Sequence, residues 1–140
     1  MTRPVVVYAS VWVSWRVTDN VFHAASRRWF AQQAAVEGQL VAPVLMLAEV
    51  VGATSRRTSQ PDLASRTLKG LLRLPGLRLV PLDRRLGREA AELAASASLR
   101  GADAVYAALA SHLSIPLITW DLELRQRVGN SVEVVQPSEV

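Results

Sequence analysis

Three carboxylates stand out in this sequence because of the residues around them. Glu49 is the only polar side chain in the run from 44 to 53, and Asp103 opens another apolar run. Asp121 closely follows the apolar segment Pro116–Thr119. A buried carboxylate costs free energy unless a cation, a hydrogen bond or a proton compensates for it. Together the three acids could hold Mg²⁺ or Mn²⁺, ions that take oxygen ligands and support chemistry on phosphates.

Each of these acids also has a purely structural explanation. Asp103 and Asp121, like Asp83, could cap the N-terminus of a helix, where the helix dipole favours negative charge. Glu49 lies too far inside its expected helix to act as a cap. An exposed position or an ion pair with an arginine would explain it instead. Spacing along the chain leaves both kinds of explanation open.

The composition excludes several other kinds of site. The 140 residues include no cysteine, which excludes disulfides, thiol nucleophiles and Cys-bound metals. The two histidines, His23 and His112, have no companion nucleophile or base in the sequence, and we expect both to be structural. No glycine-rich phosphate loop occurs. A metal bound to this chain would therefore be a hard ion held by oxygen atoms.

The chain is basic, with 16 Lys and Arg against 12 Asp and Glu and a net charge of +4. Arg binds phosphate through planar, two-pronged contacts, so a nucleic-acid partner is one interpretation. An Arg-rich composition inherited from a GC-rich genome is the other. Arg66, Lys69 and Arg73 share one side of an expected helix and are candidate RNA contacts, although such a stripe is also typical of a solvated helix face.

Short apolar segments alternate with longer helical patterns along the chain. The expected strands are Val5–Tyr8, Leu40–Ala42, Leu77–Leu82, Pro116–Thr119 and Ser131–Val135. The expected helices are a short one after the first strand, Phe22–Glu37, Pro43 to Arg57, Pro61–Leu74, one that Asp83 caps, Ala102–Leu113 and Asp121–Arg127. This alternation predicts one α/β domain whose parallel sheet is covered by helices on both faces. Functional sites on such sheets lie beyond the carboxyl ends of the strands.

Two tryptophans, Trp12 and Trp15, lie three residues apart on the short helix expected after the first strand. They could line a groove for a helix of a partner protein, or they could pack in the core. No apolar stretch reaches the ~20 residues that a membrane span requires. The first residues are better explained as a buried strand than as a signal peptide. We therefore expect a cytoplasmic protein with no membrane partner.

Four blocks of this sequence resemble the PIN domain, most closely the VapC-like toxins of type II toxin–antitoxin systems. The blocks are Val5–Trp12, Ala42–Val50, Asp103–Ala110 and Pro116–Asp121. The resemblance covers nearly the whole chain, residues 1–140. It implies a three-layer α/β/α sandwich around a five-stranded parallel sheet. It also implies a Mg²⁺- or Mn²⁺-dependent endoribonuclease with an RNA substrate, a VapB-like antitoxin as partner and a homodimer.

The same resemblance assigns the residues of a site. Glu49, Asp103 and Asp121 match the catalytic, metal-binding acids. Ser10 and Thr119 match supporting hydroxyls that orient a carboxylate, a water or a phosphate. On this basis the three acids, which are far apart along the chain, are expected to meet at the edge of the sheet.

Tyr8 departs from the pattern of the family, which has a metal-binding Asp at this position. A neutral phenol, with an ordinary pKa of about 10, is a poor ligand for Mg²⁺ and is bulkier than Asp. We therefore expect weakened metal binding and impaired ribonuclease activity. The alternative is a catalytically silent module of this fold that binds an antitoxin or RNA. A receiver-like or hydrolase-like phosphotransfer domain ranks last, since it also needs an Asp where Tyr8 stands.

Overall fold

A five-stranded parallel sheet forms the centre of the molecule, whose computed structural model describes residues 2–140. The strands are β1 (Val5–Val7), β2 (Leu40–Pro43), β3 (Leu77–Val80), β4 (Leu117–Ile118) and β5 (Val134–Val135). Their order in the sheet is β3-β2-β1-β4-β5, and every neighbouring pair is parallel. The expected parallel sheet is confirmed, and the predicted strand ends differ from the observed ones by at most three residues.

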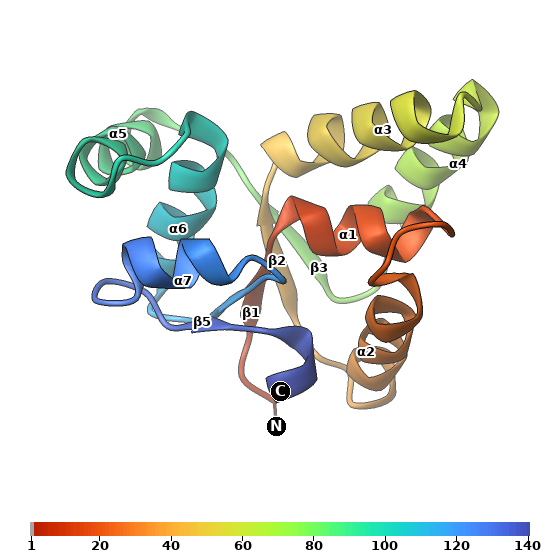
Figure 1. Ribbon diagram of the computed structural model, residues 1–140, viewed down its shortest axis with the longest axis horizontal. Coiled ribbons are helices and arrows are strands. Elements are labelled where there is room, and N and C mark those ends of the chain that lie inside the picture. Colours follow the sequence, from red (N-terminus) through yellow and green to blue (C-terminus); the bar gives the residue numbers. More distant parts are fainter. Residues whose placement is uncertain (1) are drawn as a thin grey trace.

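Seven α-helices and one short 3₁₀ helix surround this sheet in residues 2–140. They are α1 (Ala9–Arg16), α2 (His23–Ala35), α3 (Leu45–Thr58), α4 (Pro61–Leu72), α5 (Arg84–Ala97), α6 (Gly101–Leu113), α7 (Leu122–Val128) and η1 (Pro137–Glu139). Figure 1 shows α1 to α4 on one side of the sheet and α5 to α7 on the other. The molecule is therefore the expected three-layer α/β/α sandwich. Within residues 2–140, none of these helices has the length and apolar character that crossing a bilayer demands.

The central strand β1 is buried on both faces because helices cover both sides of the sheet. Val5, Val6 and Val7 expose 5% or less of their surface. Val6 pairs with Val41 of β2 on one side and with Leu117 of β4 on the other. An unbroken apolar run is typical of such a strand, which explains why the sequence alone indicates it.

The start of the third helix is a point where the prediction was wrong. Pro43 was expected to open the helix, but it is the last residue of β2 and pairs with Val80 of β3. Proline disfavours a helical conformation in the residue before it, so Ala42 stays extended. The next residue, Val44, donates its backbone N–H to the carbonyl oxygen of Val80 and then begins α3.

Helix α6 lies deep in the molecule, and its buried residues hold its first turn in place. Its residues from Ala104 to Ala110 are all buried, and five of these seven are small or β-branched. A helix that is apolar on all sides belongs in a core. It packs between the sheet and α5. Asp103, one residue before this buried stretch, is consequently held at the edge of the sheet.

Candidate active site

Tyr8, Glu49 and Asp121 each follow one of the three central strands at its carboxyl end. Tyr8 directly follows β1, and its backbone N–H continues the ladder by donating to the carbonyl oxygen of Ile118. Glu49 lies in the second turn of α3, which follows β2, and Asp121 lies after β4. Because β2, β1 and β4 are neighbours and parallel, their carboxyl ends meet at one edge.

Tyr8 bridges from the end of β1 to the first turn of α6. Its hydroxyl donates a hydrogen bond to Oδ1 of Asp103. Asp103 also accepts a bond from Nε of Arg100, at 3.4 Å. The N-cap position of α6 is Arg100, so Asp103 lies in the first turn and does not cap the helix with its side chain. Its main partner is therefore Tyr8.

Glu49 accepts a hydrogen bond from a second phenol, as Asp103 does from Tyr8. The hydroxyl of Tyr106, a buried residue of α6, donates to Oε1 of Glu49 at 2.8 Å. The rings of Tyr106 and Tyr8 pack with their centroids 4.8 Å apart. The two phenols thus lie between Glu49 and Asp103, and each binds one of these carboxylates. Among the ion pairs described in residues 2–140, none includes Glu49.

Partial burial favours the protonated form of both carboxyl groups. Burial raises the pKa of Glu49, although the hydrogen bond from Tyr106 opposes this effect. Burial also raises the pKa of Asp103, the negative charge of Asp121 adds to the rise, and Arg127 partly offsets it. Burial and the neighbouring Glu49 raise the pKa of Tyr106 so far that it stays a hydrogen-bond donor. The effect of the Asp121 charge on the pKa of Asp103 is consistent with their lining the same cavity.

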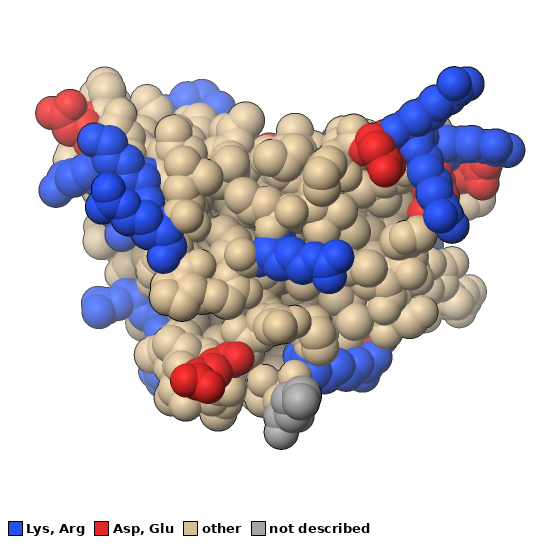
Figure 2. Space-filling view, turned by 180° about the vertical axis from the view of Figure 1, so that it is seen from behind, with Lys and Arg blue, Asp and Glu red and all other residues tan. Residues whose placement is uncertain are grey.

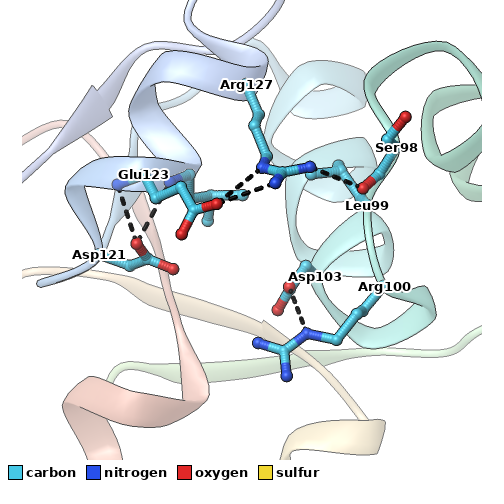
Figure 3. Close-up of a pocket in the computed structure, with 8 residues that line it drawn as sticks. Ser98, Leu99, Arg100, Asp103, Asp121, Glu123 and Arg127 are labelled. Atoms are coloured by element: carbon cyan, nitrogen blue, oxygen red, sulfur yellow. Dashed lines mark hydrogen bonds and ion pairs between the residues drawn. The ribbon is translucent and has the colours of Figure 1, made fainter.

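Asp103 and Asp121 line one polar cavity of about 300 Å³. Figure 3 shows Asp103 and Arg100 on one side of it and Asp121, Glu123 and Arg127 on the other. Arg127 bonds to Glu123 at 2.9 Å and to the carbonyl oxygen of Ser98 at 2.9 Å, which ties α7 to the end of α5. Two arginines therefore already accompany the acids of this cavity. Glu49 is outside its lining.

Asp121 is held by its own helix and by Thr119. Its Oδ1 accepts the backbone N–H groups of Glu123 and Leu124, so the predicted capping role is confirmed. Thr119 is buried, and its hydroxyl accepts the backbone N–H of Asp121 at 3.1 Å. Ser10 is exposed and lines a second cavity that also includes Asp121.

The cap predicted at Asp83 is confirmed as well, because its side chain accepts the backbone N–H of Leu86 in the first turn of α5.

The residues as they stand do not fit a carboxylate-bound metal ion. In the part of the chain from residue 2 to 140, no three His, Asp or Glu side chains cluster closely enough to hold one. Beside Asp103 stands the phenol of Tyr8, which donates to it and packs against the ring of Tyr106. Mg²⁺ requires several oxygen ligands at short distance, and a neutral phenol is a poor one.

The candidate RNA contacts lie away from these acids. Arg66, Lys69 and Arg73 are exposed on α4 and just after it. Figure 2 shows basic side chains gathered on the side of the molecule where α4 lies and again on the side where α5 lies. In Figure 1, α4 lies across the sheet from α6 and α7. The expected solvent-exposed basic stripe is confirmed, whereas its contact with RNA stays a prediction.

Sequence reasoning missed three residues of the site: Tyr106, Arg100 and Arg127. Tyr106 stands three residues after Asp103, one helical turn away on the same face, and this spacing was the available signal. Arg100 precedes Asp103 by the same distance. Arg127 follows Glu123 by four residues, a spacing at which opposite charges pair on a helix.

Comparisons with known proteins agree with this architecture. None of the curated proteins matches the sequence significantly. Among solved structures, VapC20 of Mycobacterium tuberculosis, a toxin that cleaves the sarcin–ricin loop, is 17% identical, with 93% of this chain and 98% of that chain covered and a TM-score of 0.78. VapBC2 of Rickettsia felis, bound to promoter DNA, is 12% identical, with 96% and 98% covered and a TM-score of 0.74.

A toxin–antitoxin complex of Klebsiella pneumoniae is 15% identical, with 97% of this chain and 99% of that chain covered and a TM-score of 0.63. These likenesses establish a shared fold. The model of the PIN domain matches residues 5–129, which include every strand except β5 and all seven α-helices. The chain therefore belongs to the PIN domain family.

Proposed function

We propose that this protein is a VapC-like PIN-domain endoribonuclease in which Tyr8 impairs the metal-dependent site. The observation that carries the proposal is the hydrogen bond from Tyr8 to Asp103, made by a ring that packs on Tyr106. Glu49, Asp103 and Asp121, the acids that the resemblance assigns to the site, are all present in the sequence and support the proposal. Tyr8 occupies the position from which a fourth acid would face Asp103.

The chemistry of the chain's own residues is consistent with a blocked site. Tyr8 and Tyr106 donate to the carboxylates that would otherwise bind Mg²⁺ or Mn²⁺. Partial burial keeps the pKa of Glu49 and Asp103 raised, which disfavours the ionised form that binds metal. The hydroxyl of Thr119 accepts the backbone N–H of Asp121 and so helps to hold that residue in place. Ser10 is exposed beside Asp121, where it could contact RNA.

The direct test is the Tyr8→Asp variant, assayed on single-stranded RNA with Mn²⁺. We expect cleavage by this variant that EDTA abolishes, and little or none by the natural chain. Tyr8→Asn is the matched control, because it removes the ring without supplying a charge. Tyr8→Asp combined with Asp103→Asn should be inactive again.

Two results would contradict the proposal. Equal, EDTA-sensitive cleavage by the natural chain and by Tyr8→Asp would show that Tyr8 does not impair the site. No cleavage by Tyr8→Asp, in a variant that folds, would remove the ribonuclease assignment itself. The circular dichroism spectrum and melting temperature of each variant establish that it folds.

A second candidate function is a silent module that binds an antitoxin, and one apolar cavity favours it. The cavity, of about 290 Å³, is lined by Trp15, Phe30 and Leu74 among others. Trp12 is fully buried in the core, so only Trp15 of the two tryptophans is available to a partner. A VapB-like antitoxin would place a helix there, in a cytoplasmic complex that also contains a homodimer of this chain.

The product of the neighbouring upstream reading frame is the partner to test. It should bind the natural chain in calorimetry, and Trp15→Ala should weaken that binding. If both forms bind equally, the cavity at Trp15 is not the antitoxin site. This readout is independent of RNA cleavage, so it separates the second function from the first.

A further inference from the structure

A second cavity, of about 320 Å³, opens on another side of Asp121. Its lining includes Ser10, Phe22, Arg57 and Trp120, contributed by α1, the residue before α2, the last turn of α3 and the segment after β4. It shares Asp121 with the acidic cavity described above. The two cavities therefore have Asp121 as a common lining residue.

An aromatic pair forms one wall of the cavity. The rings of Phe22 and Trp120 are stacked, with centroids 4.5 Å apart and an angle of 4° between their planes. Trp120 is fixed from behind, because its Nε1 donates to Oγ of the buried Ser26 at 3.0 Å. The backbone N–H of Phe22 donates to the side chain of Asn20 at 2.8 Å. The pair is thus held rigidly.

This pair is only partly covered by the rest of the protein. Phe22 exposes 37% of its surface, and its neighbour Val21 exposes 87%. Large apolar side chains that are exposed together and held rigid are typical of binding surfaces. A fixed aromatic ring loses little entropy when a planar ligand stacks on it.

The polar part of the lining has the chemistry of a phosphate contact. Arg57 is exposed, and the ion pairs described in residues 2–140 do not include it. Its guanidinium group can therefore donate to an incoming anion in a two-pronged contact. Ser10 adds a hydroxyl to the lining of the same cavity. An aromatic face next to a guanidinium group is the combination that binds single-stranded nucleic acid.

We propose that this cavity is a nucleotide subsite, in which one unpaired RNA base stacks on Phe22 and the adjoining phosphate binds Arg57. The proposal rests on the proposed function, since it takes RNA as the ligand of the neighbouring site. It adds the residues that select an unpaired strand, because a base inside a duplex cannot present its face to Phe22.

The test measures the affinity of the full chain for a fluorescent single-stranded RNA oligomer by anisotropy, in EDTA. A second oligomer with the same backbone lacks its bases. The natural chain should bind the base-bearing oligomer more tightly, and Phe22→Leu should weaken that binding about five- to hundredfold. Phe22→Trp, which keeps an aromatic face, should retain it. Binding of the base-free oligomer should be the same in all three proteins.

Arg57 has a matched control on the same helix. Arg57→Gln should weaken the binding of both oligomers and make it less sensitive to salt, whereas Arg56→Gln should do neither. Leu72→Ala is the control for loss of an exposed apolar side chain that does not line the cavity. Melting temperatures establish that every variant folds.

Equal affinity for the two oligomers, or no effect of Phe22→Leu on the base-bearing one, would overturn the subsite. So would the absence of any RNA binding. These results are separable from failure of the proposed function, which is read from cleavage by Tyr8→Asp. Cleavage by that variant with no base-dependent binding would leave the ribonuclease assignment intact and remove only the subsite.

Discussion

The hydroxyl of Tyr8 donates a hydrogen bond to Asp103, a residue 95 positions later in the chain. The bond joins the end of the central strand to the first turn of the most buried helix. It places a neutral donor against a carboxylate that a metal-dependent nuclease would keep free. The stability of the fold and the chemistry of the site therefore depend on the same pair.

Removing the hydroxyl should destabilise the fold. Tyr8→Phe keeps the ring on Tyr106 but leaves the partly buried Asp103 without its main partner, at a cost of about 1–3 kcal/mol. Urea unfolding measures this cost. In a double-mutant cycle with Asp103→Ala, which removes the acceptor, the two changes should be coupled by at least about 0.5 kcal/mol. Independent effects of the two substitutions would show that the bond contributes nothing.

Stability should depend on pH through Glu49. Its pKa is raised in the folded protein, so the folded chain binds more protons than the unfolded one above the ordinary pKa of 4.5. This group therefore lowers stability as the pH rises through that window. Glu49→Gln cannot ionise and still accepts the bond from Tyr106. The stability of Glu49→Gln relative to the natural chain should rise as the pH increases above the ordinary pKa of 4.5.

Urea unfolding of both proteins across this range measures the difference. Glu92→Gln, on the exposed side of α5, serves as the control for loss of a surface carboxylate. A relative stability of Glu49→Gln that is flat with pH would contradict the effect assigned to burial.

Metal binding should appear when Tyr8 is replaced by an acid. Titration with Mn²⁺ in a calorimeter should give at least about tenfold tighter binding by Tyr8→Asp than by the natural chain, a gain of about 1.4 kcal/mol. The added carboxylate supplies an oxygen ligand, and removal of the ring frees Asp103. Tyr8→Asn should bind no better than the natural chain. Tight binding by the natural chain would show that the phenols do not exclude the ion.

The basic stripe formed by Arg66, Lys69 and Arg73 should contribute to RNA affinity only if the RNA backbone contacts it. Replacing Arg66, Lys69 and Arg73 by Ser should make the salt dependence of RNA binding shallower by a slope of about 2, because three phosphate contacts are lost. The same change at Arg84, Arg85 and Arg88 of α5 is a control of equal charge. An unchanged slope in the α4 variant would identify the stripe as an ordinary solvated helix face.

Much of the architecture could be predicted from local patterns. The run Val5–Val7 indicates a strand buried on both faces, and the start of α4 at Pro61 and the caps at Asp83 and Asp121 follow from residue types that favour helix starts. Prediction failed at Pro43, where a local preference for helix starts competed with pairing to Val80. Pairing between strands depends on residues far away in the chain, which local patterns do not contain.

The candidate site also has features that the sequence predicts and features that only the tertiary structure reveals. Sequence alone singled out Glu49, Asp103 and Asp121, because each is an acid next to an apolar run, and the family resemblance then implied a common site for them. Tertiary structure alone decided that Tyr106 binds Glu49, that Tyr8 binds Asp103, and that Glu49 lies outside the cavity of the other two acids. Side-chain directions and partners result from packing between elements distant in the chain, so no spacing along the sequence encodes them.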